Sequence, residues 1–208
     1  MPIKDCLQNL KRRDQLGKDI ISLLNKDERV TNVEFYGSLA KGTADPYSDI
    51  DLHVQLQNVS DRAFAEILPD LIRPVDTCLI EGWGLGALPD DYVRTFYFES
   101  YPIFWHVDIH CKSAHHIDGS DIQNTYHWSQ IFKIWIDVVS NWARGKDTTD
   151  YIERFMGKWT DLSKATGSPP QKLSQYLDLC AERARKRGAP CDTFYNRCDE
   201  LRREYLEA

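Results

Sequence analysis

Apolar and polar residues alternate in several short segments of the first half of the chain, as they do in strands with one buried face. We predict strands over residues 30–36, 49–56, 76–81, 92–100 and 103–111. Apolar residues spaced three and four apart predict helices over residues 5–26 and 61–71, and a short helix follows the Gly-Ser turn over 38–44. The first half is therefore a mixture of strands and helices.

Beyond about residue 115 only the helical period remains. A capping box at 120–123 precedes this region, and Ser168 with Pro169 forms a second helix start. The predicted helices cover, in order, the apolar stripes at 131–142 and 151–162, the segment 169–187 and the segment 192–206. We predict an α+β protein with two domains, a mixed sheet with flanking helices at 1–115 and an all-helical bundle at 116–208.

The predicted strand at 49–56 carries two aspartates on one face. Side chains two residues apart share a face, so Asp49, Asp51 and His53 form one row. The alternate residues between and after them are apolar. Two carboxylates this close, with no Lys or Arg between them, repel each other unless a divalent cation lies between them. This row therefore predicts a metal site.

Gly37 and Ser38 precede this strand at a predicted turn. A glycine lets the backbone approach a ligand closely, and a serine hydroxyl with nearby N–H groups binds phosphate oxygens. A phosphate-binding turn next to a metal-binding strand indicates a nucleoside triphosphate bound with magnesium.

Gly37-Ser38, followed by Asp49-Ile50-Asp51, resembles the signature of the nucleotidyltransferase superfamily that includes DNA polymerase beta. The resemblance implies a nucleotidyltransferase sheet, two Mg²⁺ ions and transfer of a nucleoside monophosphate, AMP from ATP, with release of pyrophosphate. It further implies nucleotide binding by four residues of the turn and the loop after it, Gly37, Ser38, Lys41 and Ser48. For Lys41, an exposed helix lysine is an equally good interpretation.

A third carboxylate follows from alternation in the predicted strand at 103–111. His106, Asp108 and His110 share one face there, so three aspartates converge if the two strands lie close in one sheet. The superfamily places a third carboxylate on such a later strand, which implies that Asp108 joins Asp49 and Asp51 in catalysis and metal binding. Asp108 would act as a metal ligand, as a general base, or as both. We interpret the histidines as polar neighbours of the site, because magnesium prefers oxygen ligands.

The charge distribution bears on the acceptor. The net charge is −6, and residues 1–111 hold 11 Lys and Arg against 18 Asp and Glu. This acidic half disfavours DNA or another long polyanion and suits a cationic small molecule. The chain is closest in organisation to the aminoglycoside nucleotidyltransferases, which bind the acceptor between a transferase domain and a helical bundle. We expect four acidic residues to line that cleft: Glu81, Asp90, Asp91 and Glu99.

Two other functions remain open. An antitoxin-type transferase would modify a protein or an RNA end, and a non-enzymatic module would only bind nucleotide. The six cysteines are scattered without paired spacing, which favours free thiols over disulfides or a zinc site. No apolar run has the length of a membrane span, and the first residues lack the apolar core that is typical of a signal peptide. We predict a cytoplasmic enzyme without a membrane partner; the sequence does not indicate its oligomeric state.

Overall fold

A computed structural model of the chain describes residues 7–79, 86–117, 119, 128–158, 165–189 and 191–207. The described residues form two compact units, one within residues 7–119 and one within residues 128–207. The described residues of the first unit end at 119, and those of the second begin at 128. The predicted domain boundary at residue 115 therefore stays a prediction.

A mixed five-stranded sheet forms the centre of the first unit, in the order β1-β2-β5-β4-β3. Its strands are β1 Val30–Tyr36, β2 Ile50–Leu56, β3 Gly86–Ala87, β4 Tyr92–Phe96 and β5 Val107–Ser113. Strands β2 and β5 are parallel, and the other neighbours are antiparallel. This mixed sheet confirms the predicted fold class and places β2 next to β5.

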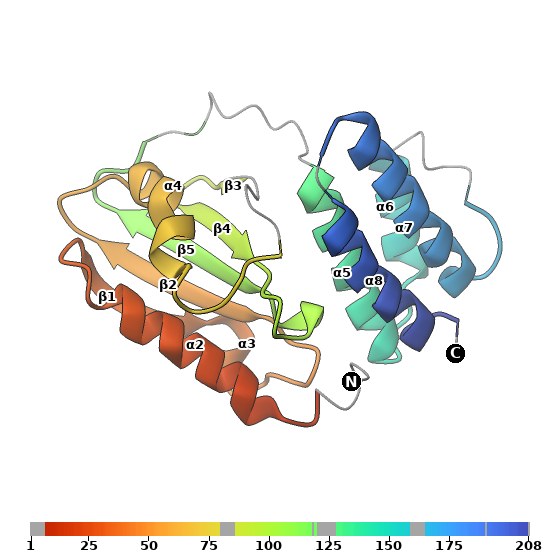
Figure 1. Cartoon of the computed structure of the whole chain (residues 1–208), viewed down its shortest axis with the longest axis horizontal. Coiled ribbons are helices and arrows are strands. Elements are labelled where there is room, and N and C mark those ends of the chain that lie inside the picture. Colours follow the sequence, from red (N-terminus) through yellow and green to blue (C-terminus); the bar gives the residue numbers. More distant parts are fainter. Residues whose placement is uncertain are drawn as a thin grey trace. The chain divides into compact units, whose positions relative to one another are not determined.

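Helices α2 (Leu10–Leu24) and α4 (Asp61–Ile72) cover one face of this sheet (Figure 1). The apolar row of β2 and β5 packs against them in a continuous core, which includes Leu52, Val54, Ile109 and the helix residue Phe64. Alternation along the strands therefore leaves the polar row on the other face. Helix α4 begins at the capping residue Ser60, whose Oγ accepts the Ala63 N–H (3.2 Å), and it accommodates Pro69 near its end.

Gly17 allows α2 to approach the sheet closely. A Cβ at this position would collide with the ring of Phe35 and lie 3.4 Å from Ile50 Cγ2. In an exposed helix Gly→Ala stabilises by about 1 kcal/mol. We expect Gly17→Ala to destabilise instead, by about 2 kcal/mol, because the core must open to admit the methyl group. Urea unfolding would measure this, with exposed Lys18→Ala as the control that stays within about 0.5 kcal/mol of the wild type. Unchanged or increased stability of Gly17→Ala would contradict the close packing.

Two strand predictions were wrong in detail. Residues 76–79 contribute only an isolated bridge, Cys78 to Phe98, and not a strand. Residues Ile103–Trp105 form a 3₁₀ turn in which all three side chains are buried, and Trp105 Nε1 donates to the Pro46 carbonyl (2.8 Å). The strand therefore begins only at Val107. Residues 80–85, including Glu81, Gly82 and Gly84, lie outside the described residues.

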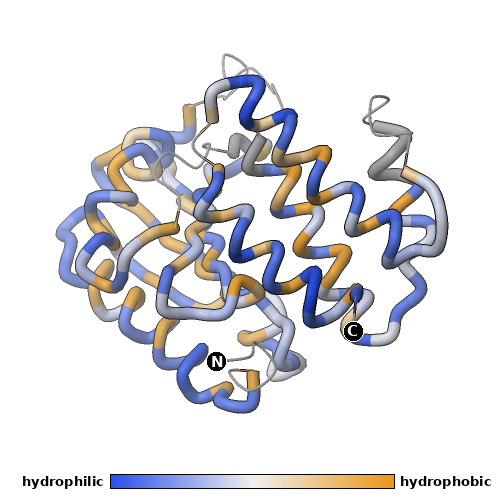
Figure 2. Tube along the Cα trace, turned by 45° about the vertical axis from the view of Figure 1, so that its right-hand side comes forward, coloured by the Kyte–Doolittle hydropathy of each residue, from blue (hydrophilic) through white to orange (hydrophobic). Residues whose placement is uncertain are grey.

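The described part of the second unit is helical, as predicted. Its helices are α5 Trp128–Ala143, α6 Thr149–Lys158, α7 Pro169–Lys186 and α8 Asp192–Tyr205. Hydrophilic and hydrophobic positions alternate along them (Figure 2), and α7 packs against the other three. The predicted capping box at the start of α7 is present, with Gln171 Oε1 accepting the Ser168 N–H (2.9 Å). The box at 120–123, Trp159 and Leu162 lie outside the described residues.

The described cysteines are all free thiols, as predicted, and Cys6 lies outside the described residues. Burial raises the pKa of the Cys111 and Cys198 thiols above their usual value, which disfavours the reactive thiolate. None of the described helices combines the length and the apolar character needed to cross a membrane.

Candidate active site

The polar face of β2 and β5 brings the predicted carboxylates together. The two strands are parallel neighbours in which Asp51 pairs with Asp108 and His53 pairs with His110. Asp49 lies one residue before the start of β2, and His106 lies one residue before the start of β5. The side chains of both segments alternate between the two faces as predicted, and the three aspartates lie on one face of the sheet.

Asp49, His106 and Asp108 lie close together in this arrangement. Each offers one ligand atom, and these atoms lie within 4.8 Å of one another. Asp49 Oδ2 lies 3.3 Å from His106 Nε2, and the Thr95 hydroxyl donates to Asp108 Oδ1 (2.5 Å). The ring of Tyr97 stacks on His106 with centroids 5.1 Å apart. Neighbouring side chains thus orient both carboxylates.

Asp51 lies between the other two aspartates in an unfavourable environment for a negative charge. Burial, followed by repulsion from Asp49 and Asp108, raises the pKa of Asp51 to about 6, although His106 and His110 lower it. A carboxylate held near two others is destabilised when it ionises, and a bound cation relieves that cost. The arrangement therefore favours a cation at neutral pH.

The Gly-Ser turn lies directly against Asp51. Tyr36 pairs with Asp51 at the end of β1, and helix α3 (Gly37–Ala40) begins there. Gly37 has φ +61°, and a Cβ at this position would collide with the Asp51 carboxylate. The Ser38 Oγ is buried and has no hydrogen-bond partner among the described residues. A buried hydroxyl next to an approachable backbone is suited to binding a ligand oxygen.

The other two predicted nucleotide-binding residues are placed differently. Lys41 is exposed and follows α3 directly, so both interpretations of it remain open. Ser48 is buried, and its hydroxyl donates to Asp45 Oδ1 (3.0 Å) and accepts the Asp45 N–H (2.9 Å). These bonds show that Ser48 shapes the loop before β2. Its role in nucleotide binding stays a prediction.

Sequence reasoning missed the contribution of β4 to the site. Thr95 pairs with Asp108 across the sheet, and Asp91, just before β4, lies 3.1 Å from His110 Nδ1. The available signal for Thr95 was a polar residue on the same strand face as the apolar Val93. The sequence predicts Asp91 only as a residue of the acceptor cleft, together with Asp90 and Glu99, which are exposed.

The hydrogen bond from Thr95 predicts a measurable effect on Asp108. Thr95→Val keeps the shape of the side chain but removes the donor, so the Asp108 carboxylate loses the bond that orients it. We expect nucleotidyl transfer, measured as pyrophosphate release, to fall about tenfold. Thr95→Ser retains the hydroxyl and should behave like the wild type. An unchanged rate for Thr95→Val would show that the bond does not act on the chemistry.

A comparison with protein families identifies the domain that contains this site. Residues 18–113, which contain the Gly-Ser turn and all three aspartates, match the family model described as the nucleotidyltransferase domain. This match shows that residues 18–113 form a nucleotidyltransferase domain, as the resemblance of the segment from Gly37 to Asp51 implied.

Two solved structures show a distant likeness. One is the polymerase core of TRAMP, an RNA surveillance complex, with 12% identity and a TM-score of 0.40, covering 83% of this chain and 58% of that one. The other is the GLD-2/RNP-8 complex, with 18% identity and a TM-score of 0.35, covering 74% and 56%. This chain therefore spans little more than half the length of either. No curated protein sequence matches the chain. The assignment rests on the family match and the site.

Proposed function

We propose that this nucleotidyltransferase moves AMP from ATP to a hydroxyl of a small cationic molecule, such as an aminoglycoside, and releases pyrophosphate. The observation that carries the transfer chemistry is the convergence of Asp49, Asp51 and Asp108 beside a turn whose glycine has no room for a Cβ. The acceptor class rests on the acidic character of residues 1–111.

The site fits magnesium by its donor chemistry. Its three carboxylates are hard oxygen donors, and burial followed by repulsion from Asp49 and Asp108 raises the pKa of Asp51, a cost that a bound cation relieves. Asp49, Asp51 and Asp108 would hold the metal, and Mg²⁺ when bound neutralises the charge that develops on the transferring phosphoryl group.

The residues of the turn bind and orient the nucleotide. The buried Ser38 hydroxyl supplies a donor to a phosphate oxygen, and the missing side chain at Gly37 lets the triphosphate approach the backbone. This placement holds the α-phosphorus over the aspartates, where an acceptor oxygen can attack in line with the leaving pyrophosphate.

Asp108 acts as the general base in this proposal. It takes the proton of the acceptor hydroxyl as that oxygen bonds to the α-phosphorus and the bond to the pyrophosphate oxygen breaks. The Thr95 hydrogen bond holds the Asp108 carboxylate in one orientation for this transfer.

The test is turnover with defined substrates. The chain is incubated with Mg²⁺, each labelled nucleoside triphosphate in turn, and a panel of aminoglycosides, and both pyrophosphate and the mass of each acceptor are measured. We expect an acceptor to gain the mass of AMP with the wild type but not with Asp108→Asn. Label on a co-purified protein or RNA would instead identify the antitoxin-type activity. No turnover with any small acceptor would contradict the proposed acceptor class.

A further inference from the structure

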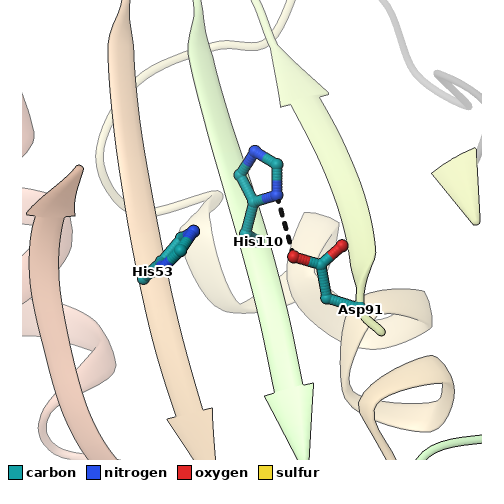
Figure 3. Close-up of side chains that lie close together, drawn as sticks. All are labelled: His53, Asp91 and His110. Atoms are coloured by element: carbon teal, nitrogen blue, oxygen red, sulfur yellow. Dashed lines mark hydrogen bonds and ion pairs between the residues drawn. The ribbon is translucent and has the colours of Figure 1, made fainter. Parts of the chain in front are cut away.

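A cluster of two histidines and one aspartate lies on the same sheet face as the three site aspartates. Its histidines are two residues beyond Asp51 and Asp108 along β2 and β5. His53 on β2 and His110 on β5 are register partners, and Asp91 approaches them from the residue before β4 (Figure 3). One ligand atom from each residue lies within 4.8 Å of the other two. None of the three takes part in the proposed transfer.

We propose that His53, Asp91 and His110 form a separate cation site for a transition metal of the Zn²⁺ class. Two imidazoles and a carboxylate are a ligand set that zinc accepts, whereas magnesium prefers oxygen alone. The 3.1 Å between His110 Nδ1 and Asp91 Oδ2 is close to the separation of about 3.3 Å between two ligands at a tetrahedral zinc ion. Small side-chain rotations would bring the third ligand to bonding distance.

The surrounding structure holds the two histidines in place. The parallel register of β2 and β5 places their ring centroids 5.2 Å apart, and the Tyr36 ring stacks on His53 at 4.0 Å with planes 12° apart. Ligands fixed in this way lose little side-chain entropy when a metal binds. The site is therefore largely preformed.

Asp91 supplies a further observation that points to a cation. Its side chain is 16% exposed, and its Oδ1 is buried without a hydrogen-bond partner among the described residues. A buried carboxylate oxygen without a partner is costly, and a cation compensates that cost. A hydrogen bond from His110 would satisfy Asp91 Oδ2. It would leave Asp91 Oδ1 without a partner in the described part of the chain, and it would not explain why His53 lies close to both residues.

The cluster is distinct from the proposed magnesium site. A step of two residues along a strand is about 6.6–6.8 Å, so the two sites can be filled independently. Three protein ligands leave a position of a four-coordinate ion open to water or a small ligand. The ion would also tie the residue before β4 to the centre of the sheet.

The test uses Co²⁺ as a visible probe for a zinc-type site. The metal-free chain is titrated with Co²⁺ in excess Mg²⁺, which fills the carboxylate site, and Zn²⁺ is then added as competitor. We expect one equivalent of Co²⁺ with visible d–d absorption and without a thiolate charge-transfer band, and we expect Zn²⁺ to displace it. Absence of Co²⁺ and Zn²⁺ binding would overturn the proposal.

Four variants locate the bound ion. His53→Gln and Asp91→Asn should each weaken Co²⁺ binding at least tenfold, whereas His115→Gln, an exposed histidine outside the cluster, should not. Asp49→Asn should also retain binding, which separates this site from the one formed with His106. A thermal melt shows whether each variant is folded. If His53→Gln is unfolded, Asp91→Asn is the test of the site, because asparagine still accepts the hydrogen bond from His110 but is a poorer metal ligand than aspartate. Binding that survives both His53→Gln and Asp91→Asn would place the metal elsewhere and refute the site.

Discussion

Replacing Asp51 with asparagine should remove activity and stabilise the metal-free protein at the same time. The variant keeps the side-chain volume but cannot ionise, so it loses a ligand charge for the metal on which we expect transfer to depend. We expect kcat/KM to fall about 10³-fold, equivalent to about 4 kcal/mol of transition-state stabilisation. In chelator, however, we expect a gain in unfolding free energy, because the charged form of Asp51 is unfavourable in the folded chain.

The pH dependence gives the sign of this second effect. The folded pKa of Asp51, about 6, lies above the unfolded value of about 3.9, so the folded state binds more protons between the two. The contribution of protonated Asp51 to the unfolding free energy is fully present below about pH 4 and is lost as the pH rises through about 6. Asp51→Asn should therefore match the wild type in stability at pH 4 and exceed it at pH 7–8, by about 1–2 kcal/mol after solvent screening is allowed for.

Thermal melts in chelator across this pH range would measure the difference. Magnesium should raise the melting temperature of the wild type at pH 7.5 and have little effect on Asp51→Asn. The exposed carboxylate Asp70, in an ion pair with Arg73, provides a matched control. Asp70→Asn should neither gain stability at pH 7.5 nor lose the rise in melting temperature with magnesium. Equal stability of Asp51→Asn and wild type at pH 7.5 would mean that the aspartates do not repel one another as the geometry indicates.

Local pattern was sufficient to predict which side chains share the polar face of β2 and β5. The alternation around Asp51 and Asp108 fixes which side chains share a face, and it holds even though the residues just before Val107 form a 3₁₀ turn. His106 has extended dihedral angles, so its side chain keeps the same parity as Asp108. The Gly37 turn was likewise predictable from residue type and spacing.

What the sequence could not supply is which strands are neighbours. The pairing of Asp51 with Asp108 depends on β5 lying beside β2, although about fifty residues separate them in sequence. The same holds for Asp91 and Thr95, which reach the site only because β4 pairs with β5. The two-histidine cluster has ligands from three separate segments, so no fixed spacing in the sequence reveals it.

The second large effect is expected at Gly37, where backbone conformation and carboxylate position are linked. Gly37 and Gly42 both have positive φ, +61° and +66°, so alanine at either position costs about 1–2 kcal/mol in backbone strain. They differ in what a Cβ would meet: the Asp51 carboxylate at Gly37, and no atom within 4 Å at Gly42. Comparison of the two alanine variants therefore separates carboxylate displacement from backbone strain.

We expect Gly37→Ala to lower kcat/KM about 10²-fold, since a displacement of a catalytic group by about 1 Å has an effect of that size. Gly42→Ala should lose similar stability in a thermal melt but keep nearly full activity. Nucleotide binding, measured by calorimetry with Mg²⁺ and ATP, should weaken only in Gly37→Ala, because the displaced Asp51 can no longer hold the metal beside the phosphate turn. If both variants lose activity equally, backbone strain in the loop accounts for the loss, and the contact between Gly37 and Asp51 has no separate role in the site.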